Sequence, residues 1–193
     1  RAELFRPDED VEVSVVVPAF DEAESLPELI ERIEASLRPI TPEFEVLIID
    51  DGSRDGTEAL LTELRQTRPW LRPIHFLRNY GKSAALAVGF SRARGSVVFT
   101  IDADLQDDPA EVPKLLAGLD EGKDLVVGWK MQRLEHEPRK TIPSRVFNTL
   151  LRWTFGLDLR DSNSGYRVMR RAVAQSLHLY GDMYRFIPQL AFS

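Results

Sequence analysis

Two aspartates separated by one residue, Asp102 and Asp104, carry the clearest chemical signal in the sequence. They follow an apolar run at 96–101 that reads as a buried strand, so both carboxylates leave the backbone on the same side. Neighbouring carboxylates repel each other unless a cation or proton lies between them, and their hard oxygen atoms suit Mg²⁺ or Mn²⁺. Gln106 offers another oxygen two residues later. Turns and helix starts also collect aspartates, but the position after an apolar strand favours a metal site.

Polar groups that could bind a phosphorylated ligand follow two other apolar runs. Asp51 lies in an Asp-Asp-Gly-Ser sequence, which is a turn signal and could also present a carboxylate to the base or ribose of a nucleotide. Lys82 stands at the expected start of a helix, where its ammonium group could neutralise a phosphate or simply be exposed. This segment is not a phosphate-cradling P-loop, because the upstream glycine and its spacing are missing.

An alternation of short apolar runs and amphipathic segments positions these residues. Strands are expected at residues 13–17, 44–49, 74–77, 96–101 and 125–127. Helices are expected to begin near residues 25, 56, 83 and 109. Such alternation predicts an α/β fold with a mainly parallel sheet flanked by helices, in which ligands bind beyond the carboxyl ends of the strands. The candidate residues fall at that edge.

Composition narrows the classes of function. A chain of 193 residues suits one domain, and the absence of cysteine excludes disulfides and thiolate metal sites. The net charge of −6 argues against a nucleic-acid partner. Residues 128–171 nevertheless hold ten lysines and arginines against four acidic residues. This segment indicates an anionic ligand or an anionic membrane surface, although a solvated helix surface would give the same pattern.

Both ends of the chain are expected to be cut from a longer protein. The sequence begins at Arg1 and stops within an apolar stretch, 186–192. We find no apolar run near the roughly 20 residues that a bilayer-spanning helix needs.

Five motifs in register resemble the family-2 glycosyltransferases of the GT-A fold. They are V-S-V-V-V-P-A-F-D-E, I-I-D-D-G-S-R-D-G-T, N-Y-G-K-S, D-A-D-L-Q-D-D-P and D-S-N-S-G-Y-R. Within that family the sequence is most similar to dolichol-phosphate mannose synthases and bactoprenol-phosphate glycosyltransferases, and the tail G-D-M-Y-R-F-I-P resembles the bacterial branch. The resemblance implies a single Rossmann-like GT-A catalytic domain over 1–193. Its donor-binding part would span about 11–128, and its acceptor loop and helix about 129–193.

The resemblance also implies roles for individual residues. The residues around the donor nucleotide would be Pro18, Phe20, Glu22, Asp51 and Lys82. Asp102 and Asp104 would be catalytic and would hold Mg²⁺ or Mn²⁺ together with Gln106. The residues that grip the acceptor phosphate would be Lys130, Arg139, Lys140, Ser144 and Arg145. For each of these last residues, an alternative is a place on the polar face of a helix.

The implied reaction is transfer of a sugar from a UDP- or GDP-linked donor to a dolichyl or undecaprenyl phosphate, with inversion at the anomeric carbon. Because a phosphate monoester is anionic near neutral pH, catalysis would rest on positioning and charge stabilisation, with no protein base. The full protein is expected at the cytoplasmic face of a membrane, anchored through a segment absent from this sequence.

Two alternatives stay open. One is a family-2 transferase with a hydroxyl acceptor in polysaccharide synthesis, against which the basic acceptor segment argues. The other is a non-catalytic nucleotide-sugar binding subunit, against which the intact Asp102, Asp104 and Gln106 argue.

Overall fold

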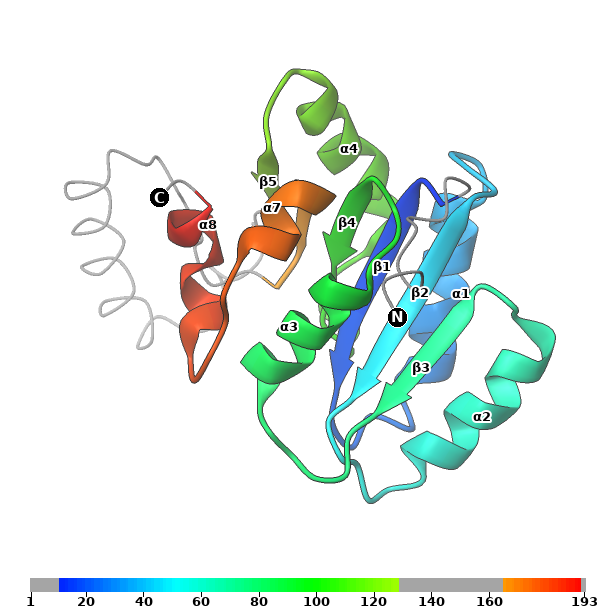
Figure 1. Cartoon of the computed structure of the whole chain (residues 1–193). Coiled ribbons are helices and arrows are strands. Elements are labelled where there is room, and N and C mark those ends of the chain that lie inside the picture. Colours follow the sequence, from blue (N-terminus) through cyan, green and yellow to red (C-terminus); the bar gives the residue numbers. More distant parts are fainter. Residues whose placement is uncertain (1–10, 129–164, 192–193) are drawn as a thin grey trace, which may run out of the picture.

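The computed structural model of the chain describes residues 11–128 and 165–191. Within these ranges a six-stranded sheet has the order β3-β2-β1-β4-β6-β5, and helices cover both of its faces (Figure 1). The expected α/β fold is therefore confirmed. None of the helices in the described ranges is long and apolar enough to cross a bilayer.

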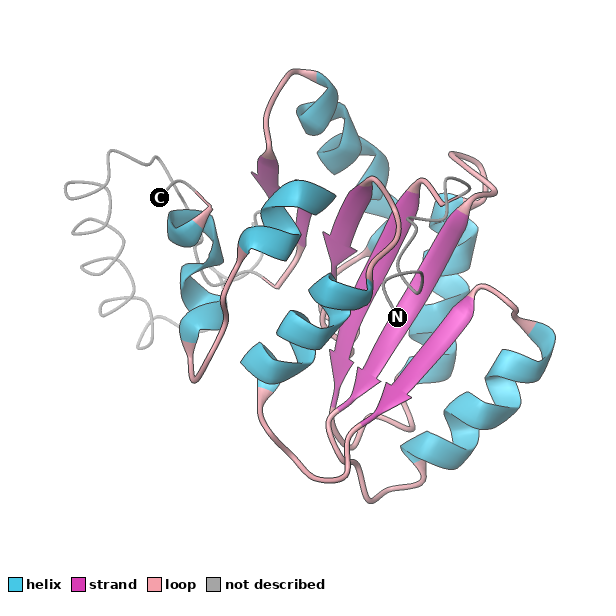
Figure 2. Cartoon of the chain, viewed as in Figure 1, coloured by secondary structure: helices cyan, strands magenta, loops and turns pink. Residues whose placement is uncertain are grey.

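Four parallel strands form the centre and one edge of the sheet. They are β1 (Val13–Ala19), β2 (Phe44–Asp50), β3 (Leu71–His75) and β4 (Val97–Thr100). The β2 strand is buried along its whole length. Strands covered on both faces read as continuous apolar runs, which is why β1 and β2 are plain in the sequence. Their carboxyl ends meet at the lower edge in Figure 2, where the connecting loops gather.

The third strand was expected at 74–77, but β3 begins three residues earlier, at Leu71, and ends at His75. Phe76 and Leu77 instead belong to the loop that follows it, and Leu77 is fully exposed. As an edge strand, β3 pairs only with β2, and it tolerates Pro73 because one of its sides makes no ladder.

One strand, β6 (Arg167–Arg170), was not expected from the sequence. It pairs antiparallel with β4 on one side and with β5 (Leu125–Val127) on the other. The expected fifth strand, β5, exists but therefore lies at the edge of the sheet. The Arg-Val-Met-Arg sequence of β6 gives a weak strand signal, since arginines stand at both of its ends.

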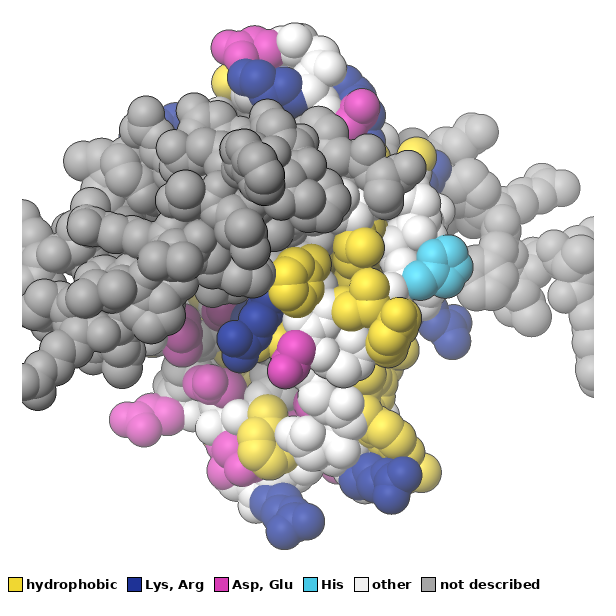
Figure 3. Space-filling model, turned by 90° about the vertical axis from the view of Figure 1, so that its left-hand side faces the viewer, with side chains coloured by type: hydrophobic (Ala, Val, Ile, Leu, Met, Phe, Trp, Pro, Cys, Tyr) yellow, Lys and Arg dark blue, Asp and Glu magenta, His cyan; other side chains and the backbone are white. Residues whose placement is uncertain are grey.

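The four expected helices begin at or near the expected residues, and two further short helices were not expected. Together the helices divide the core into two clusters. One face of the sheet is covered by α1 (Leu26–Leu37), α2 (Thr57–Thr67) and α4 (Val112–Asp120), the last preceded by a short 3₁₀ turn, η1 (Pro109–Glu111). The other face is covered by α3 (Lys82–Arg92), α7 (Arg171–Ser176) and α8 (Ile187–Leu190), with the 3₁₀ turn η2 (Met183–Phe186) before α8. Figure 3 looks onto the side where α8 lies, and shows hydrophobic side chains gathered in the middle of that face with acidic and basic ones below.

The helix α3 packs unusually close to the sheet at Gly89. A Cβ atom at this residue would lie 2.3 Å from Cγ1 of Val16 on β1, so glycine permits the approach. Helix α3 begins at Lys82, and its distance from the sheet therefore sets where the Lys82 side chain enters the site.

An ionic cluster around the buried Glu45 lies at the opposite ends of the strands, at the amino ends of β1 and β2. Glu45 is 1% exposed and accepts hydrogen bonds from Ser14 Oγ at 2.6 Å and Arg94 Nε at 2.9 Å. Arg72 makes a further short contact with the same carboxylate. Burial by itself raises the pKa of Glu45, but the hydrogen bonds and the charge of Arg72 outweigh it and lower the pKa below its ordinary value.

Candidate active site

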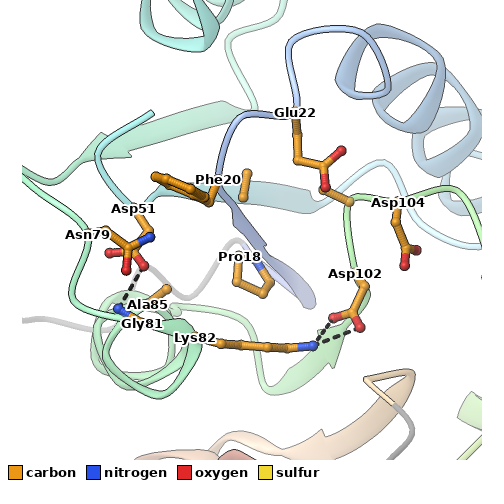
Figure 4. Close-up of a pocket in the computed structure, with 12 residues that line it drawn as sticks. Pro18, Phe20, Glu22, Asp51, Asn79, Gly81, Lys82, Ala85, Asp102 and Asp104 are labelled. Carbon is orange, nitrogen blue, oxygen red and sulfur yellow. Dashed lines mark hydrogen bonds and ion pairs between the residues drawn. The ribbon is translucent and has the colours of Figure 1, made fainter. Parts of the chain in front are cut away.

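A pocket of about 290 Å³ opens at the carboxyl ends of β1, β2 and β4. Most of the residues predicted for the donor and metal sites line it: Pro18, Phe20, Glu22, Asp51, Lys82, Asp102 and Asp104 (Figure 4). Gln106 is exposed and is not among the lining residues. The fold thus gathers into one place residues that are up to 86 positions apart, from Pro18 to Asp104.

The Asp51 carboxylate shapes one wall of the pocket. Its Oδ1 accepts a hydrogen bond from the backbone N–H of Tyr80 at 2.7 Å, and its Oδ2 accepts one from Gly81 at 2.8 Å. Asp51 is 4% exposed, so these bonds compensate the burial of a charge. They fix the loop between β3 and α3 against the end of β2, and they set the start of the helix that carries Lys82.

A pair of loops at the pocket rim is held by reciprocal hydrogen bonds. The backbone N–H of Asp21 donates to Ser53 Oγ at 2.8 Å, and the Arg54 N–H donates to Asp21 Oδ1 at 2.7 Å. Asp21 adopts a left-handed φ of 55°, which aspartate tolerates better than most residues. These bonds link the loop after β1, which carries Phe20 and Glu22, to the loop after β2.

The turn that follows the Asp-x-Asp motif contains a second left-handed residue. Leu105 has a φ of 58°, a conformation that costs about 1–2 kcal/mol for a residue with a Cβ atom. It packs against the apolar core, and it brings the backbone N–H of Gln106 to 3.1 Å from Asp104 Oδ1. Strain held in place by packing is a frequent property of functional sites.

An ion pair between Lys82 and Asp102 crosses the floor of the pocket (Figure 4). The ammonium Nζ lies 2.6 Å from Oδ1 and 2.7 Å from Oδ2 of Asp102, so it contacts both carboxylate oxygens. Both side chains remain partly open to solvent, at 30% and 25% exposure. Asp104 lies nearby in the same pocket with an exposed side chain.

Two residues that were not expected at the site, Gly165 and Tyr184, lie against this ion pair. A Cβ atom on Gly165 would lie 2.5 Å from both carboxylate oxygens of Asp102, so Asp102 occupies space that only glycine leaves free. The Tyr184 ring lies 5.1 Å from Lys82 Nζ in a cation–π contact, and its backbone N–H donates to Ser83 Oγ at 3.1 Å. Both belong to recognised motifs in the sequence, but no spacing rule predicts contacts across such distances along the chain.

The residues of the pocket fit a hard divalent cation. Its lining provides carboxylates from Asp102 and Asp104 and neither cysteine nor histidine, a donor set that suits Mg²⁺ or Mn²⁺ more than Zn²⁺. Within the described ranges no cluster of three acidic or histidine side chains forms a closed metal cage. A cation held here would therefore keep coordination positions for a ligand's oxygen atoms. The residues predicted for the acceptor site, Lys130, Arg139, Lys140, Ser144 and Arg145, lie outside the described residues.

Comparison with known proteins decides the family. Residues 14–177 match the family described as Glycosyl transferase family 2. The chain belongs to glycosyl transferase family 2. The resemblance drawn from the five motifs is thus confirmed.

The name of one curated relative includes a lipid carrier, undecaprenyl phosphate. The chain is 36% identical over 183 residues to an undecaprenyl-phosphate 4-deoxy-4-formamido-L-arabinose transferase of Pseudomonas savastanoi pv. phaseolicola. The match covers 94% of this chain and 54% of that protein, so the chain spans about half the length of this relative.

Solved structures agree on the fold. A mannosyltransferase of Pyrobaculum calidifontis, in complex with GDP-mannose and Mn²⁺, matches with a TM-score of 0.65 at 22% identity, covering 91% of this chain and 49% of that one. Glucosyl-3-phosphoglycerate synthase of Mycobacterium tuberculosis, with Mn²⁺ and UDP-glucose, matches with a TM-score of 0.64 at 24% identity, covering 90% and 61%. The fold is the GT-A fold of nucleotide-sugar transferases.

Proposed function

We propose that this chain is the catalytic domain of an inverting glycosyltransferase that moves a sugar from a nucleoside diphosphate to a polyprenyl phosphate. The observation that carries the proposal is a single pocket at the carboxyl ends of the strands. It brings Asp102, Asp104 and Lys82 together with the residues expected around the donor nucleotide. The name of the 36% identical relative supports undecaprenyl phosphate as the acceptor class.

The donor nucleotide occupies the side of the pocket formed by the loops after β1 and β2. Phe20 is 45% exposed, and its ring offers a face on which a base can stack. Glu22 and Asp51 offer carboxylate oxygens to ribose hydroxyl groups. The two solved neighbours hold GDP-mannose and UDP-glucose, which supports a nucleoside diphosphate sugar and leaves uridine and guanosine as alternatives for the base.

Asp102 and Asp104, with Gln106 beside them, hold the divalent cation. Mg²⁺ or Mn²⁺ supplies Lewis-acid stabilisation of the negative charge that develops on the departing diphosphate. Lys82 enters the pocket from the opposite side and adds a positive charge at its floor. The acceptor phosphate oxygen attacks the anomeric carbon on the face away from the diphosphate, so the new bond forms with inversion. Positioning and charge stabilisation supply the rate, since the attacking oxygen is already anionic.

The acceptor lipid places the reaction at a membrane surface, on the cytoplasmic side in our proposal. The basic segment from Lys130 to Arg145 is proposed to bind the lipid phosphate, in keeping with its excess of positive charge.

Calorimetric titration with UDP and with GDP, each with and without Mn²⁺, tests the donor half of this proposal. We expect one nucleotide to bind, and to bind more tightly when Mn²⁺ is present. Failure of both nucleotides to bind in the presence of Mn²⁺ would contradict the donor site.

A further inference from the structure

The Lys82 ammonium occupies both oxygens of the carboxylate that the proposed function assigns to the metal. Its Nζ lies 2.6 Å and 2.7 Å from the two oxygens of Asp102, a two-point contact on one carboxylate. A divalent cation that binds Asp102 needs at least one of these oxygens. Two cations so close would repel each other strongly in a partly buried pocket. Lysine and metal are therefore alternatives at this carboxylate.

Three features of the fold determine the position of the Lys82 side chain and of its partner Asp102. Its helix starts at the loop that Asp51 holds through Tyr80 and Gly81. The Tyr184 ring lies 5.1 Å from the ammonium group. Gly165 gives Asp102 room to lie where Lys82 reaches it. An exposed lysine pairing by chance would lack these supports.

The charges in the pocket indicate which group the displaced Lys82 ammonium would pair with. Lys82 and Asp102 neutralise each other as a pair. When a divalent cation takes Asp102 and Asp104, two negative charges meet two positive ones, and the Lys82 charge is left over. The diphosphate of the nucleotide provides a negatively charged partner for this ammonium, because it enters the same pocket that Lys82 lines.

We propose that Lys82 and the divalent cation exchange on Asp102, so that the metal binds tightly only when the donor diphosphate arrives to accept the Lys82 ammonium. This inference rests on the proposed function and adds to it an order of assembly. Binding of metal and nucleotide is then positively coupled, and the coupling acts equally in both directions. The site therefore has a low affinity for the metal ion alone and a high affinity for the metal ion together with the nucleotide.

Titration of Mn²⁺ into the chain, followed by the loss of the electron paramagnetic resonance signal of free Mn²⁺, tests the exchange without any need for turnover. The titration is run with and without saturating UDP or GDP, on the wild type, Lys82→Met and Lys82→Gln. Lys114→Met is the matched control, because Lys114 is an exposed lysine on α4 that pairs with Glu111 of η1. Unfolding temperatures show whether each variant is folded.

The wild type is expected to bind Mn²⁺ at least about fivefold more tightly with nucleotide than without it, the lower end of coupling between ligand sites. Lys82→Met and Lys82→Gln are expected to bind Mn²⁺ alone at least about fivefold more tightly than the wild type, and to lose most of the coupling. Lys114→Met is expected to match the wild type. Agreement of Gln with Met would show that the charge of Lys82, and not its hydrogen bonds, competes with the metal.

Equal or weaker binding of Mn²⁺ alone by the folded Lys82 variants would overturn the exchange. So would an absence of Mn²⁺ binding in every protein tested. Failure of the proposed function looks different: the wild type would bind neither nucleotide, while the titrations with Mn²⁺ alone would still decide whether Lys82 competes for Asp102.

Discussion

Asp102 and Asp104 have different surroundings although one residue separates them. Both oxygens of Asp102 contact Lys82, and its space is bounded by Gly165. Asp104 is exposed, and the backbone N–H of Gln106 donates to its Oδ1 at 3.1 Å. An entering cation can therefore bind the exposed carboxylate of Asp104 directly. To bind Asp102, the cation must replace the Lys82 ammonium.

Asp104→Asn should abolish the metal-dependent part of nucleotide binding. The amide keeps the shape of the side chain but loses the charge, so we expect a loss of about 100-fold in affinity with Mn²⁺, the upper end of the losses that changes around a metal site cause. Nucleotide binding without Mn²⁺ should change little. Calorimetry measures both, with Glu111→Gln as an exposed control on η1. Unchanged Mn²⁺-dependent affinity in Asp104→Asn would remove Asp104 from the metal site.

Gly165→Ala should damage the site while leaving the domain folded. The added methyl group would lie 2.5 Å from both Asp102 oxygens and would push the carboxylate out of place. We expect Mn²⁺-dependent nucleotide affinity to fall by about tenfold or more, as for residues that orient metal ligands.

Thr100→Val provides the comparison for Gly165→Ala. Thr100 Oγ1 donates to the backbone oxygen of Gly165 at 2.7 Å, so this change loosens the same residue without intruding on Asp102. It should cost about 1 kcal/mol of unfolding free energy and leave binding nearly intact. If both variants lose affinity equally, the crowding of Asp102 is not the cause.

At the scale of elements, the ionic cluster around the buried Glu45 and a close contact between a helix and the sheet fix α3 against β1 and β2. Glu45 joins the amino ends of β1 and β2 to the carboxyl end of α3, through Ser14 and Arg94. Gly89 lets α3 approach β1 at Val16. Because these contacts fix the carboxyl-terminal half of α3 against the sheet, they also help to determine where its first residue, Lys82, lies.

The Glu45 cluster predicts a pH-dependent part of the stability. Burial alone would raise the pKa of Glu45. Hydrogen bonds from Ser14, Arg94 and Arg72 lower it by more, so that the pKa lies below its ordinary value of 4.5. A lowered pKa in the folded state gives stability that is fully present above about 4.5, the value for the unfolded chain, and is lost as the pH falls through the folded-state value. Glu45→Gln should remove about 2–3 kcal/mol of unfolding free energy at pH 7 and much less at pH 3.

Urea denaturation at pH 7 and pH 3 measures this effect. Glu43→Gln, two residues earlier in the sequence and exposed, is the matched control and should change neither value. A destabilisation by Glu45→Gln that is equal at the two pH values would show that the carboxylate charge does not stabilise the fold.

The contact between α3 and β1 predicts a coupled pair of substitutions. Gly89→Ala places a methyl group 2.3 Å from Val16 Cγ1 and should cost about 1–3 kcal/mol through overpacking. Val16→Ala removes that obstacle, so the double variant should lose less stability than the two single losses added together, by about 1 kcal/mol. Strict additivity in urea denaturation would contradict the tight contact.

At the scale of the whole molecule, the central parallel strands and their helices were predictable from the sequence. The apolar runs of β1 and β2 and the helical spacing of Leu29, Ile30, Ile33 and Leu37 are strong local signals, because buried elements repeat their apolar residues regularly. Since four strands are parallel, the polar residues after them had to meet at one edge. This is why Asp51, Lys82, Asp102 and Asp104 could be expected to share a site.

The parts that sequence reasoning missed depend on contacts between distant segments. The short β6 strand is held by its neighbours β4 and β5, and its own sequence gives little sign of it. Gly165 and Tyr184 take their roles from Asp102 and Lys82, which lie far away along the chain. The ion pair between Lys82 and Asp102 also had no signal in the sequence, because each residue alone had a simpler explanation.

Transfer of a labelled sugar into undecaprenyl phosphate tests the central claim most directly. The chain would be incubated with Mn²⁺, detergent-dispersed undecaprenyl phosphate and labelled UDP- or GDP-sugars in turn, and label would be counted in the organic phase, with Asp104→Asn as the inactive control. The proposed function predicts Mn²⁺-dependent label in the lipid from one donor class, with the wild type only. Transfer to saccharide hydroxyl groups but not to the lipid, or donor binding with no turnover on any acceptor, would contradict it.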